Sequence, residues 1–435
     1  MSTGGGLSHP VVVAPRESRF LALPEAARLV EPDDGSAGVT YPAGFLASGV
    51  AAGLKASGRP DVGVVAVAPE WRAEAVSAAV FTTNAFAAAP VVLTRTECDL
   101  SRLVAVAINS GNANACTGDA GLLVARAMQA ASAEVLGVAA SAVAVASTGV
   151  IGVQLDAALV AAAVSRAAAA TTAGGGGDFS NSIMTTDRFP KMCAFEMDAA
   201  GGAVRLGVCA KGAGMISPAM ATMLCVASTD AVLTADEMSH MLGRAVSRSF
   251  NLVTVDGEQS TNDSVFFLAS GASGVRPEGS DLVRFGHLLD AMLLRTALMM
   301  VADGEGATKI MRLSVLGAET NEDAEAVARA IADSPLVKTA MHGGDANWGR
   351  IISSAGAALA GRDLPKARLE LCGVTVVDGG AACAVSEADR VQMRAAMQQP
   401  EIEIRLDLGS GVGSSVVFFA DMGHEYININ AEYHS

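Results

Sequence analysis

Aromatic side chains are scarce in this sequence, since Phe, Trp and Tyr together make up 4% of its 435 residues. Proteins that bind single-stranded nucleic acid stack bases on such side chains, so this composition does not suit that function. Basic residues are also in the minority, with 30 Lys and Arg against 45 Asp and Glu and a formal net charge of −15. An acidic protein repels phosphate backbones and anionic lipid surfaces. We therefore expect no nucleic-acid or membrane partner.

Long hydrophobic runs are absent as well. A bilayer requires about 18 consecutive apolar residues, whereas the Ala-rich run 157–173 contains Ser165, Arg166 and two threonines. The first 38 residues lack the basic segment and apolar core of a secretory signal; instead they carry the acidic residues Glu17, Glu25, Glu31, Asp33 and Asp34. We expect a cytoplasmic protein that begins with a loose acidic extension over 1–38.

Cysteine pairs at metal-binding spacing are also lacking. The seven cysteines form no CxxC motif and have no histidines nearby: Cys98, Cys116, Cys193, Cys209, Cys225, Cys372 and Cys383. Their number is odd, so the pattern favours neither a disulfide framework nor a zinc site. We expect buried thiols in a reducing compartment and no metal cofactor.

Small and apolar residues dominate what is present, with 51% hydrophobic residues and 46 glycines. Strand-like and helix-like patterns alternate along the chain, which predicts a layered α/β fold. The patterns predict strands over 62–68, 90–93, 103–108 and 143–146, and helices over 73–80 and 122–136. Four consecutive glycines at 174–177 predict a surface loop over 171–180. In the second half we expect helices over 233–249, 282–301 and 322–333, and strands over 401–406 and 416–420.

The most unusual stretch is 211–224, which reads KGAGMISPAMATML. It joins the end of a strand, a lysine, two glycines and a threonine set just before an apolar run. Taken alone it is equally consistent with a glycine turn between two strands. The lysine does not belong to a phosphate-binding loop, because G-x-x-x-x-G-K-[ST] is absent.

This stretch resembles the self-cleavage site of the arginine-biosynthesis ornithine acetyltransferases, also called glutamate N-acetyltransferases. Further blocks resemble motifs of that family in the same order, and the resemblance runs from about residue 39 to the last residue. These blocks are NSGNANACTG at 109–118, STGVIG at 147–152, MTTD at 184–187, NLVTVDGEQSTND at 251–263, DGEGATK at 303–309, DANWGRI at 345–351 and the tail 426–435.

The resemblance implies a layered α/β fold and a precursor that cuts itself between Ala221 and Thr222. The pieces would be an α chain, 39–221 behind the extension, and a β chain, 222–435, assembled two of each into a heterotetramer. Thr222 would be the nucleophile, and its freed α-amine, with a reference pKa of about 7.7–8.0, the adjacent base. The implied reaction moves acetyl from N2-acetyl-L-ornithine to L-glutamate without a cofactor. Whether acetyl-CoA is also a donor stays open.

Site residues follow from the same resemblance. Thr148 and Gly149 correspond to the family's oxyanion site, and the alternative for them is an ordinary strand-end turn. Positions that contact substrate in the family are occupied by Thr185, Lys211, Thr222, Glu305, Asn430 and Ser435. Thr186 is an alternative to Thr185. An amino-acid substrate carries both charges, so a cation and an anion such as Lys211 and Glu305 suit it. Taken alone, each of the two is a solvated surface charge.

Two other functions remain as alternatives. Related self-cleaving folds are amidases or aminopeptidases, which release the acyl group to water, and a chain that keeps the fold without cutting itself would be a binding protein. The sequence also departs from the family pattern at Ala219, at Ala346 and at the ending His434-Ser435. None of these departures removes the nucleophile, and Ser435 keeps a hydroxyl. Ala219 lies three residues before Thr222 and is expected to slow the cut.

Overall fold

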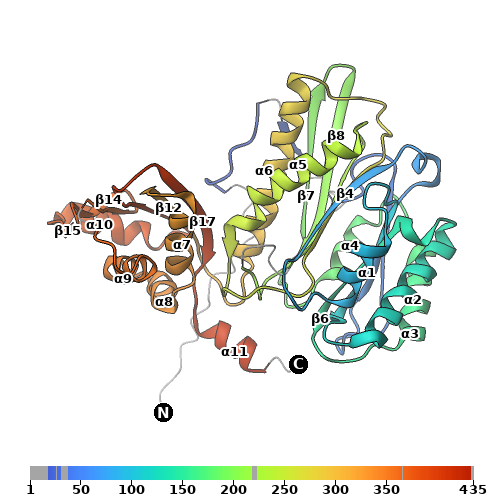
Figure 1. Cartoon of the computed structure of the whole chain (residues 1–435), viewed down its shortest axis with the longest axis horizontal. Helices are drawn as coiled ribbons and strands as arrows, with labels where there is room; N and C mark the ends of the chain where they lie inside the picture. The colour runs from blue at the N-terminus through green and yellow to red at the C-terminus, as the bar shows by residue number, and fades with distance from the viewer. Residues whose placement is uncertain (1–17, 26, 31–37, 218–222, 365, 433–435) are drawn as a thin grey trace, which may run out of the picture. The chain divides into compact units, whose positions relative to one another are not determined.

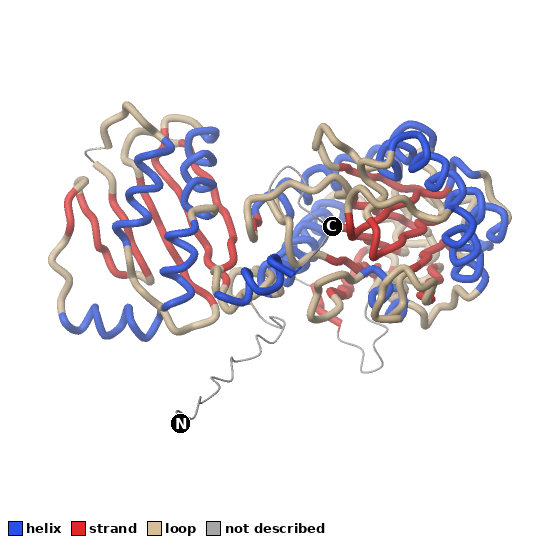
Figure 2. The backbone as a smooth tube through the Cα atoms, turned by 90° about the horizontal axis from the view of Figure 1, so that it is seen from below, coloured by secondary structure: helices blue, strands red, loops and turns tan. Residues whose placement is uncertain are grey.

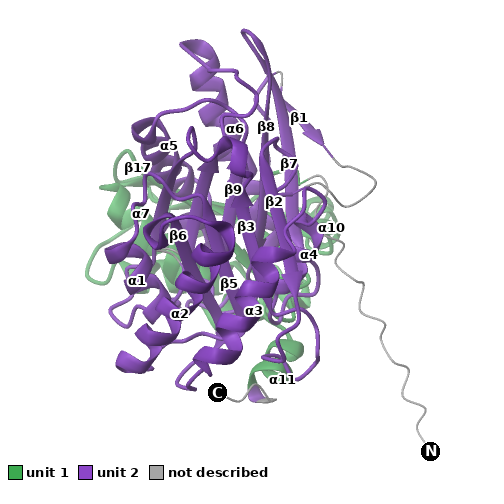
Figure 3. Ribbon diagram, turned by 90° about the vertical axis from the view of Figure 1, so that its right-hand side faces the viewer, with its two compact units in different colours: residues 1–20, 301–430 green, residues 21–300, 431–435 purple. Residues whose placement is uncertain are grey.

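The computed structural model describes residues 18–25, 27–30, 38–217, 223–364 and 366–432. The chain divides into two compact units (Figure 3). Unit 1 comprises 1–20 and 301–430, and unit 2 comprises 21–300 and 431–435. Each is described by itself.

Unit 2 contains two β-sheets. A six-stranded sheet has the order β1 (Ala27–Val30), β7 (Lys191–Ala199), β8 (Gly202–Lys211), β9 (Leu224–Thr229), β11 (Ser264–Ala269) and β4 (Val76–Phe81). In it only β9 and β11 are parallel neighbours. A four-stranded sheet has the order β2 (Phe45–Val50), β3 (Val62–Val67), β5 (Ala105–Asn112) and β6 (Val143–Val150). Strands β3, β9 and β11 are buried throughout, because both of their faces are covered.

The two sheets pack face to face, with Val106 and Ile108 of one in the same core as Val226 and Phe266 of the other. The outer face of the four-stranded sheet is covered by α1 (Ala89–Glu97), α2 (Gly118–Leu136) and α3 (Ala157–Ala169) (Figure 1). Helix α4 (Gly176–Ile183) contacts both sheets. Helices α5 (Ala235–Ser247) and α6 (Ser280–Ala302) lie beside the six-stranded sheet. The layered α/β fold predicted from the sequence is confirmed.

Three local predictions were wrong. Residues 73–80 contain β4 instead of a helix, because pairing with β11 overrides the helix propensity of alanine. Residues 90–93 lie in α1, where Pro90 occupies the first turn. The four glycines are not a free loop, since α4 begins at Gly176. A Cβ on Gly175 would lie 1.8 Å from the carbonyl oxygen of Ala47 in β2, so the glycine permits this close approach.

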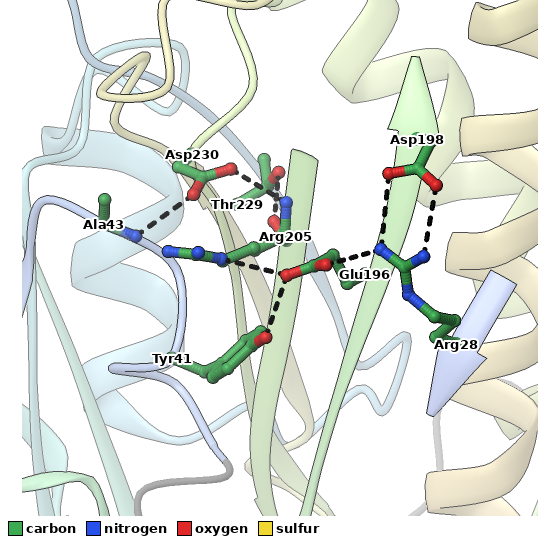
Figure 4. A network of polar contacts seen from close by, with 8 residues as sticks. All are labelled: Arg28, Tyr41, Ala43, Glu196, Asp198, Arg205, Thr229 and Asp230. Atoms are coloured by element: carbon green, nitrogen blue, oxygen red, sulfur yellow. Dashed lines mark hydrogen bonds and ion pairs between the residues drawn. The ribbon is translucent and has the colours of Figure 1, made fainter. Parts of the chain in front are cut away.

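A polar network joins the edge strand β1 to the β7–β8 hairpin (Figure 4). Arg28 contacts Glu196 at 2.6 Å and Asp198 at 3.1 Å. Glu196 also accepts hydrogen bonds from Tyr41 and Arg205. Strand β1 lies within the segment expected to be loose, and its pairing with β7 orders residues 27–30.

Unit 1 contains six strands in the order β17 (Gly413–Ala420), β12 (Ile310–Ala318), β16 (Glu401–Asp407), β13 (Arg368–Leu371), β14 (Val374–Asp378) and β15 (Ala381–Ala382). Buried and exposed residues alternate along β16, so one face of the sheet is buried. The helices are α7 (Asn321–Ala332), α8 (Pro335–Gly343), α9 (Trp348–Ala358), α10 (Glu387–Ala396) and α11 (His424–Glu432). Helix α7 packs against β12 and β17, and α9 packs on α7. In Figure 2 some helices of this unit run alongside its strands and others lie beyond the strand ends.

Two predictions made from composition concern membrane-spanning helices and cysteines. Among the described helices, α6 is the one long and apolar enough to cross a bilayer. However, 83% of its most apolar 18-residue stretch is buried inside the protein, as is typical of a core helix. All seven cysteines are described and free. Cys193, Cys209 and Cys225 are buried, whereas Cys116 is exposed, so burial was wrongly predicted for Cys116.

Candidate active site

The ends of β5 and β6 carry the first part of the candidate site, and the asparagines of block 109–118 hold them together. Ser147 donates a hydrogen bond of 2.6 Å to Asn109, and Asn109 donates to the carbonyl of Asn112. The side chain of Asn112 in turn accepts from the backbone N–H of Asn114. These buried amides replace ladder bonds where the β5–β6 register becomes irregular after Gly111. The motif therefore fixes the backbone around residues 147–149.

Gly149 lies directly against the neighbouring strand. Its φ angle is +133°, and a Cβ there would be 2.3 Å from the carbonyl carbon of Gly111. Only glycine fits such a position. The glycine therefore permits the close approach of β5 and β6 at this point.

Thr148 and Lys211 are brought together by the structure. The Lys211 Nζ donates a hydrogen bond of 3.1 Å to the Thr148 hydroxyl oxygen, and both side chains are buried. Lysine has only donors, so the hydroxyl oxygen acts as acceptor in this bond. The hydroxyl hydrogen of Thr148 then points elsewhere and can be donated to a third group. Lys211 is thus not the solvated surface charge of the alternative interpretation.

Asp187 is a buried junction beside this pair. Its carboxylate accepts the backbone N–H of Gly212 at 2.7 Å and that of Thr185 at 2.9 Å, and it forms an ion pair with Lys191. Burial alone would raise the pKa of Asp187, but Lys191 and Lys211 outweigh it and bring the pKa well below its usual range. Asp187 therefore stays ionised and ties the Thr185 loop to the residue that follows Lys211.

Two acidic residues of block 251–263 hold the backbone on both sides of the expected cut. Asp256 accepts the N–H groups of Met215 and Ile216, and Asp263 accepts the N–H of Met223 at 2.8 Å. Ala221 and Thr222 lie outside the described residues. In the antiparallel β8–β9 ladder Lys211 is paired with Leu224, two residues after Thr222.

Two further predicted substrate residues, Glu305 and Asn430, lie in unit 1. The Asn430 amide of α11 donates a hydrogen bond of 2.7 Å to the Glu305 carboxylate, and Glu305 is buried. Gly306, with φ +72°, allows the first turn of α11 to lie close, since a Cβ there would be 2.6 Å from the nitrogen of Tyr426. Glu305 is therefore not a solvated charge, and Asn430 is not in a frayed tail. Ser435 lies outside the described residues.

Sequence reasoning missed Lys55, Lys191 and the central position of Asp187. Asp187 was part of a recognised block, but only its contacts show what it holds. Lys55 donates to the carbonyls of Pro60 at 2.7 Å and Ser182 at 3.3 Å, and burial lowers its pKa to about 8. It thus ties a loop before β3 to the helix that leads to Thr185. A lysine in a glycine-containing loop carries no sequence signal for that role.

No group of three or more metal-ligating side chains occurs among the described residues. A pocket of about 330 Å³ opens beside the β5–β6 strand ends, and its wall includes Gly111, Asn112, Val150, Val153 and Leu159. The wall also includes the polar residues Gln154 and Asp156.

The chain is similar to known proteins over nearly its whole length. The sequence pattern of the ArgJ family matches residues 46–435. The "Arginine biosynthesis bifunctional protein ArgJ" of Nitratidesulfovibrio vulgaris is 45% identical over 396 residues, which cover 91% of this chain and 99% of that protein. The "Glutamate N-acetyltransferase" of Methanosarcina acetivorans is 42% identical over 374 residues, covering 83% and 92%. Among solved structures, the ornithine acetyltransferase of Mycobacterium tuberculosis complexed with ornithine is 38% identical, covers 46% of this chain and 100% of its own, and has a TM-score of 0.40.

Proposed function

Because the chain belongs to the ArgJ family, we propose that it moves acetyl from N2-acetyl-L-ornithine to L-glutamate through an acetyl ester on Thr222. Glutamate N-acetyltransferase activity in arginine biosynthesis is the activity of the protein, and the bifunctional name of its relatives covers acetyl-CoA as a further donor. Its substrates are small amino acids. The observation that carries the assignment of the site is the buried contact between Lys211 and Thr148 beside Gly149.

Covalent geometry supports Thr222 as the nucleophile. Lys211 and Leu224 are opposite each other in the β8–β9 ladder, where paired Cα atoms are about 4.5–5.5 Å apart. Thr222 precedes Leu224 by two residues, a distance of at most about 7 Å along the chain. This connectivity supports our assignment of Thr222 to the same proposed site as the Lys211–Thr148 pair. Its hydroxyl attacks the acetyl carbonyl while its own α-amine takes the proton.

The oxyanion of each tetrahedral intermediate requires donors that are already in place. The Thr148 hydroxyl can supply one, since Lys211 occupies its oxygen and leaves its hydrogen to be donated. The peptide N–H of Gly149 can supply another. Donors of this kind each contribute about 2.7–4 kcal/mol to catalysis in known enzymes.

An amino-acid substrate carries an ammonium group and a carboxylate, and we assign a different residue to each. Glu305, held by Asn430, is a buried anion suited to an ammonium group, and Lys211 is a cation suited to a carboxylate. Thr185 is the hydroxyl contact, because Asp187 fixes its backbone. Ser435 completes the set.

We also propose that the precursor is cut between Ala221 and Thr222 and that the pieces assemble as a heterotetramer of two α and two β chains in the cytoplasm. Hydrogen bonds between β8 and β9 support continued association after the cut, because one strand lies in each piece. The free cysteines are consistent with a reducing compartment.

The intact mass of the purified protein tests the proposal. We expect two fragments split before Thr222, and a fragment beginning at Thr222 that gains one acetyl group when acetylornithine is supplied without glutamate. Thr222→Ala should remain one inactive chain, and Thr222→Ser should still be cut. Parallel double-reciprocal lines are expected for the two substrates. A cut elsewhere would exclude this nucleophile, an uncut chain would favour the binding protein, and acetyl release to water without transfer would favour the hydrolase.

A further inference from the structure

Asp421 is a buried carboxylate in unit 1 for which the mechanism above has no use. It directly follows β17, and its side chain is completely buried. One oxygen, Oδ1, accepts the backbone N–H groups of Thr308 at 2.7 Å and Lys309 at 2.8 Å. The other, Oδ2, accepts the Thr308 hydroxyl at 2.6 Å and lies 2.7 Å from Nδ1 of His342. Since a carboxylate accepts about four hydrogen bonds, Asp421 uses its full capacity.

The partners of Asp421 come from two other segments of unit 1. Lys309 belongs to the DGEGATK block before β12, and His342 lies in the last turn of α8. The Lys309 ammonium also donates to the His342 carbonyl at 3.3 Å, so these two segments are bonded to each other. The His342 ring packs on Gly423 just before α11, where a Cβ would lie 2.3 Å from the ring carbon Cε1. Asp421 therefore fixes the block 303–309 and the start of α11 against the end of α8.

The two predicted substrate residues of unit 1 lie on the segments that Asp421 joins. Glu305 is three residues before Thr308 in the block 303–309, and Asn430 is on α11, the helix that begins three residues after Asp421. The Asn430 amide donates to the Glu305 carboxylate at 2.7 Å. This contact depends on how the block lies against α11. Asp421 is bonded to the block and is covalently continuous with α11.

The arrangement of the cluster differs from that of a catalytic triad. In a Ser-His-Asp triad the imidazole lies between the hydroxyl and the carboxylate. Here the carboxylate lies between Thr308 and His342 and accepts from the hydroxyl, so the imidazole is not placed to take the hydroxyl proton. Burial would raise the pKa of Asp421, but the hydrogen bonds from His342 and Thr308 outweigh it and lower the pKa below its ordinary value. The carboxylate is therefore a charged anchor at neutral pH.

We propose that Asp421 is a positioning residue of the substrate site, which holds Glu305 and Asn430 in the relative position that orients the Glu305 carboxylate for a substrate ammonium group. The inference rests on the proposed function, in which Glu305 binds that group. A charge-assisted hydrogen bond weakens steeply when its geometry is lost. Asp421 should therefore act on substrate binding and leave self-cleavage unchanged, because the cut requires no free amino acid.

The variant Asp421→Asn tests this role. It keeps the shape of the side chain and an oxygen for the backbone N–H groups of Thr308 and Lys309, but its amide group cannot accept from the Thr308 hydroxyl. We expect a complete cut, a KM for acetylornithine at least about tenfold higher, and a kcat changed by less than about threefold. Thr308→Val, which removes only one of the four bonds, should raise KM in the same direction by a smaller factor. It provides a second measurement if Asp421→Asn does not fold.

A double-mutant cycle with Asn430→Ala separates positioning from general stability. If Asp421 acts through the Asn430–Glu305 contact, Asp421→Asn combined with Asn430→Ala should lose no more kcat/KM than the worse single variant. The same holds for Thr308→Val. Independent effects would instead multiply the two losses.

The matched control is Asp407→Asn. Asp407 also lies in unit 1 and accepts a backbone N–H, that of Gly409 at 2.9 Å, but this bond belongs to the turn after β16. The control should keep the wild-type KM even if its thermal stability falls. An unchanged KM in the Asp421 and Thr308 variants, or losses that multiply with that of Asn430→Ala, would overturn the inference. A wild-type protein without acetyl transfer, or an Asn430→Ala variant with normal transfer, would refute the proposed function of the site and the inference with it.

Discussion

A single methyl group at position 149 would collide with the backbone of the neighbouring strand. The Cβ of alanine would be 2.3 Å from the Gly111 carbonyl carbon, and the φ angle of +133° is unfavourable for any side chain. Gly149→Ala must therefore push β5 and β6 apart at the proposed oxyanion site. We expect acetyl transfer to fall at least a hundredfold, by the loss of about 2.7 kcal/mol or more of transition-state stabilisation. Steady-state kinetics on the purified variant measures this loss.

Gly152 provides the control for this substitution. It also has a positive φ, +83°, but a Cβ there would meet nothing within 4 Å. Gly152→Ala should cost only about 1–2 kcal/mol of stability from backbone strain and leave transfer nearly unchanged. If both variants lose activity equally, strain alone is responsible and the contact with Gly111 has no special role.

At this scale the sequence identified residues but not their contacts. Thr148, Gly149 and Lys211 were selected by resemblance, and nothing in their spacing indicates that a lysine 63 residues away would bond to the hydroxyl of Thr148. The sequence identified Asp187 as part of the MTTD block but predicted no role for it. Its role depends on bonds to Thr185 and Gly212, which only the fold brings together.

Helix α11 presents two asparagines with different surroundings. Asn430 bonds to Glu305, whereas Asn428 bonds to the exposed Glu425 one turn earlier in the same helix. Asn430→Ala should leave the cut complete but lower acetyl transfer at least tenfold, about 1.4 kcal/mol, because Glu305 loses the donor that orients it. Asn428→Ala should leave both unchanged. A gel measures the cut and an assay measures acetyl transfer in both variants. Equal transfer by the two variants would show that Asn430 does not orient Glu305 for catalysis.

The turn between β17 and α11 depends on a histidine. His342 Nδ1 lies 2.7 Å from Asp421, and this hydrogen bond raises the pKa of His342 despite partial burial. Its ring also packs on Gly423, where a Cβ would be 2.3 Å from Cε1. Because the folded pKa is raised above the unfolded value of about 6.5, the stabilisation is complete below that pH and is lost as the pH rises through the folded pKa.

His342→Gln should therefore be less stable than the wild type at pH 6, by about 1.5 kcal/mol, and the difference should shrink toward pH 9. Thermal unfolding at both pH values measures it. The exposed His240 of α5 supplies the comparison, since His240→Gln should behave like the wild type at either pH. A difference that does not change with pH would mean that the ring only fills space.

Elements with a long periodic pattern were predictable, and those fixed by distant pairing were not. The helices α2 and α7 follow their apolar spacing. Strand β4 has an alanine-rich sequence that favours a helix by itself, and β11, more than 180 residues later, makes it a strand. The four glycines predicted a flexible loop, but β2 lies directly against Gly175, so this segment is not free.

At the scale of the whole molecule, the proposed cut divides the strands of the six-stranded sheet between the two pieces. Strands β8 and β9 are hydrogen-bonded neighbours, one in each piece, and β4 of the first piece pairs with β11 of the second. The fragments should therefore co-purify and separate only in denaturant. Gel filtration in buffer and in urea checks this, and separation of the fragments without denaturant would contradict the observed pairing.

In this sheet β9 and β11 of the second piece lie between β8 and β4 of the first. The proposed cut would therefore depend on correct folding of the precursor. The middle of this sheet contains strands from both sides of the proposed cut. Asp256 and Asp263 accept the backbone N–H groups of Ile216 and Met223 and lie just before β11, so we expect them to reach these positions only when β9 and β11 have paired. A misfolded precursor would lack them and stay in one piece. In the proposed maturation, scission would then report that this sheet has assembled, because the reactive amine would form only after β9 and β11 have paired.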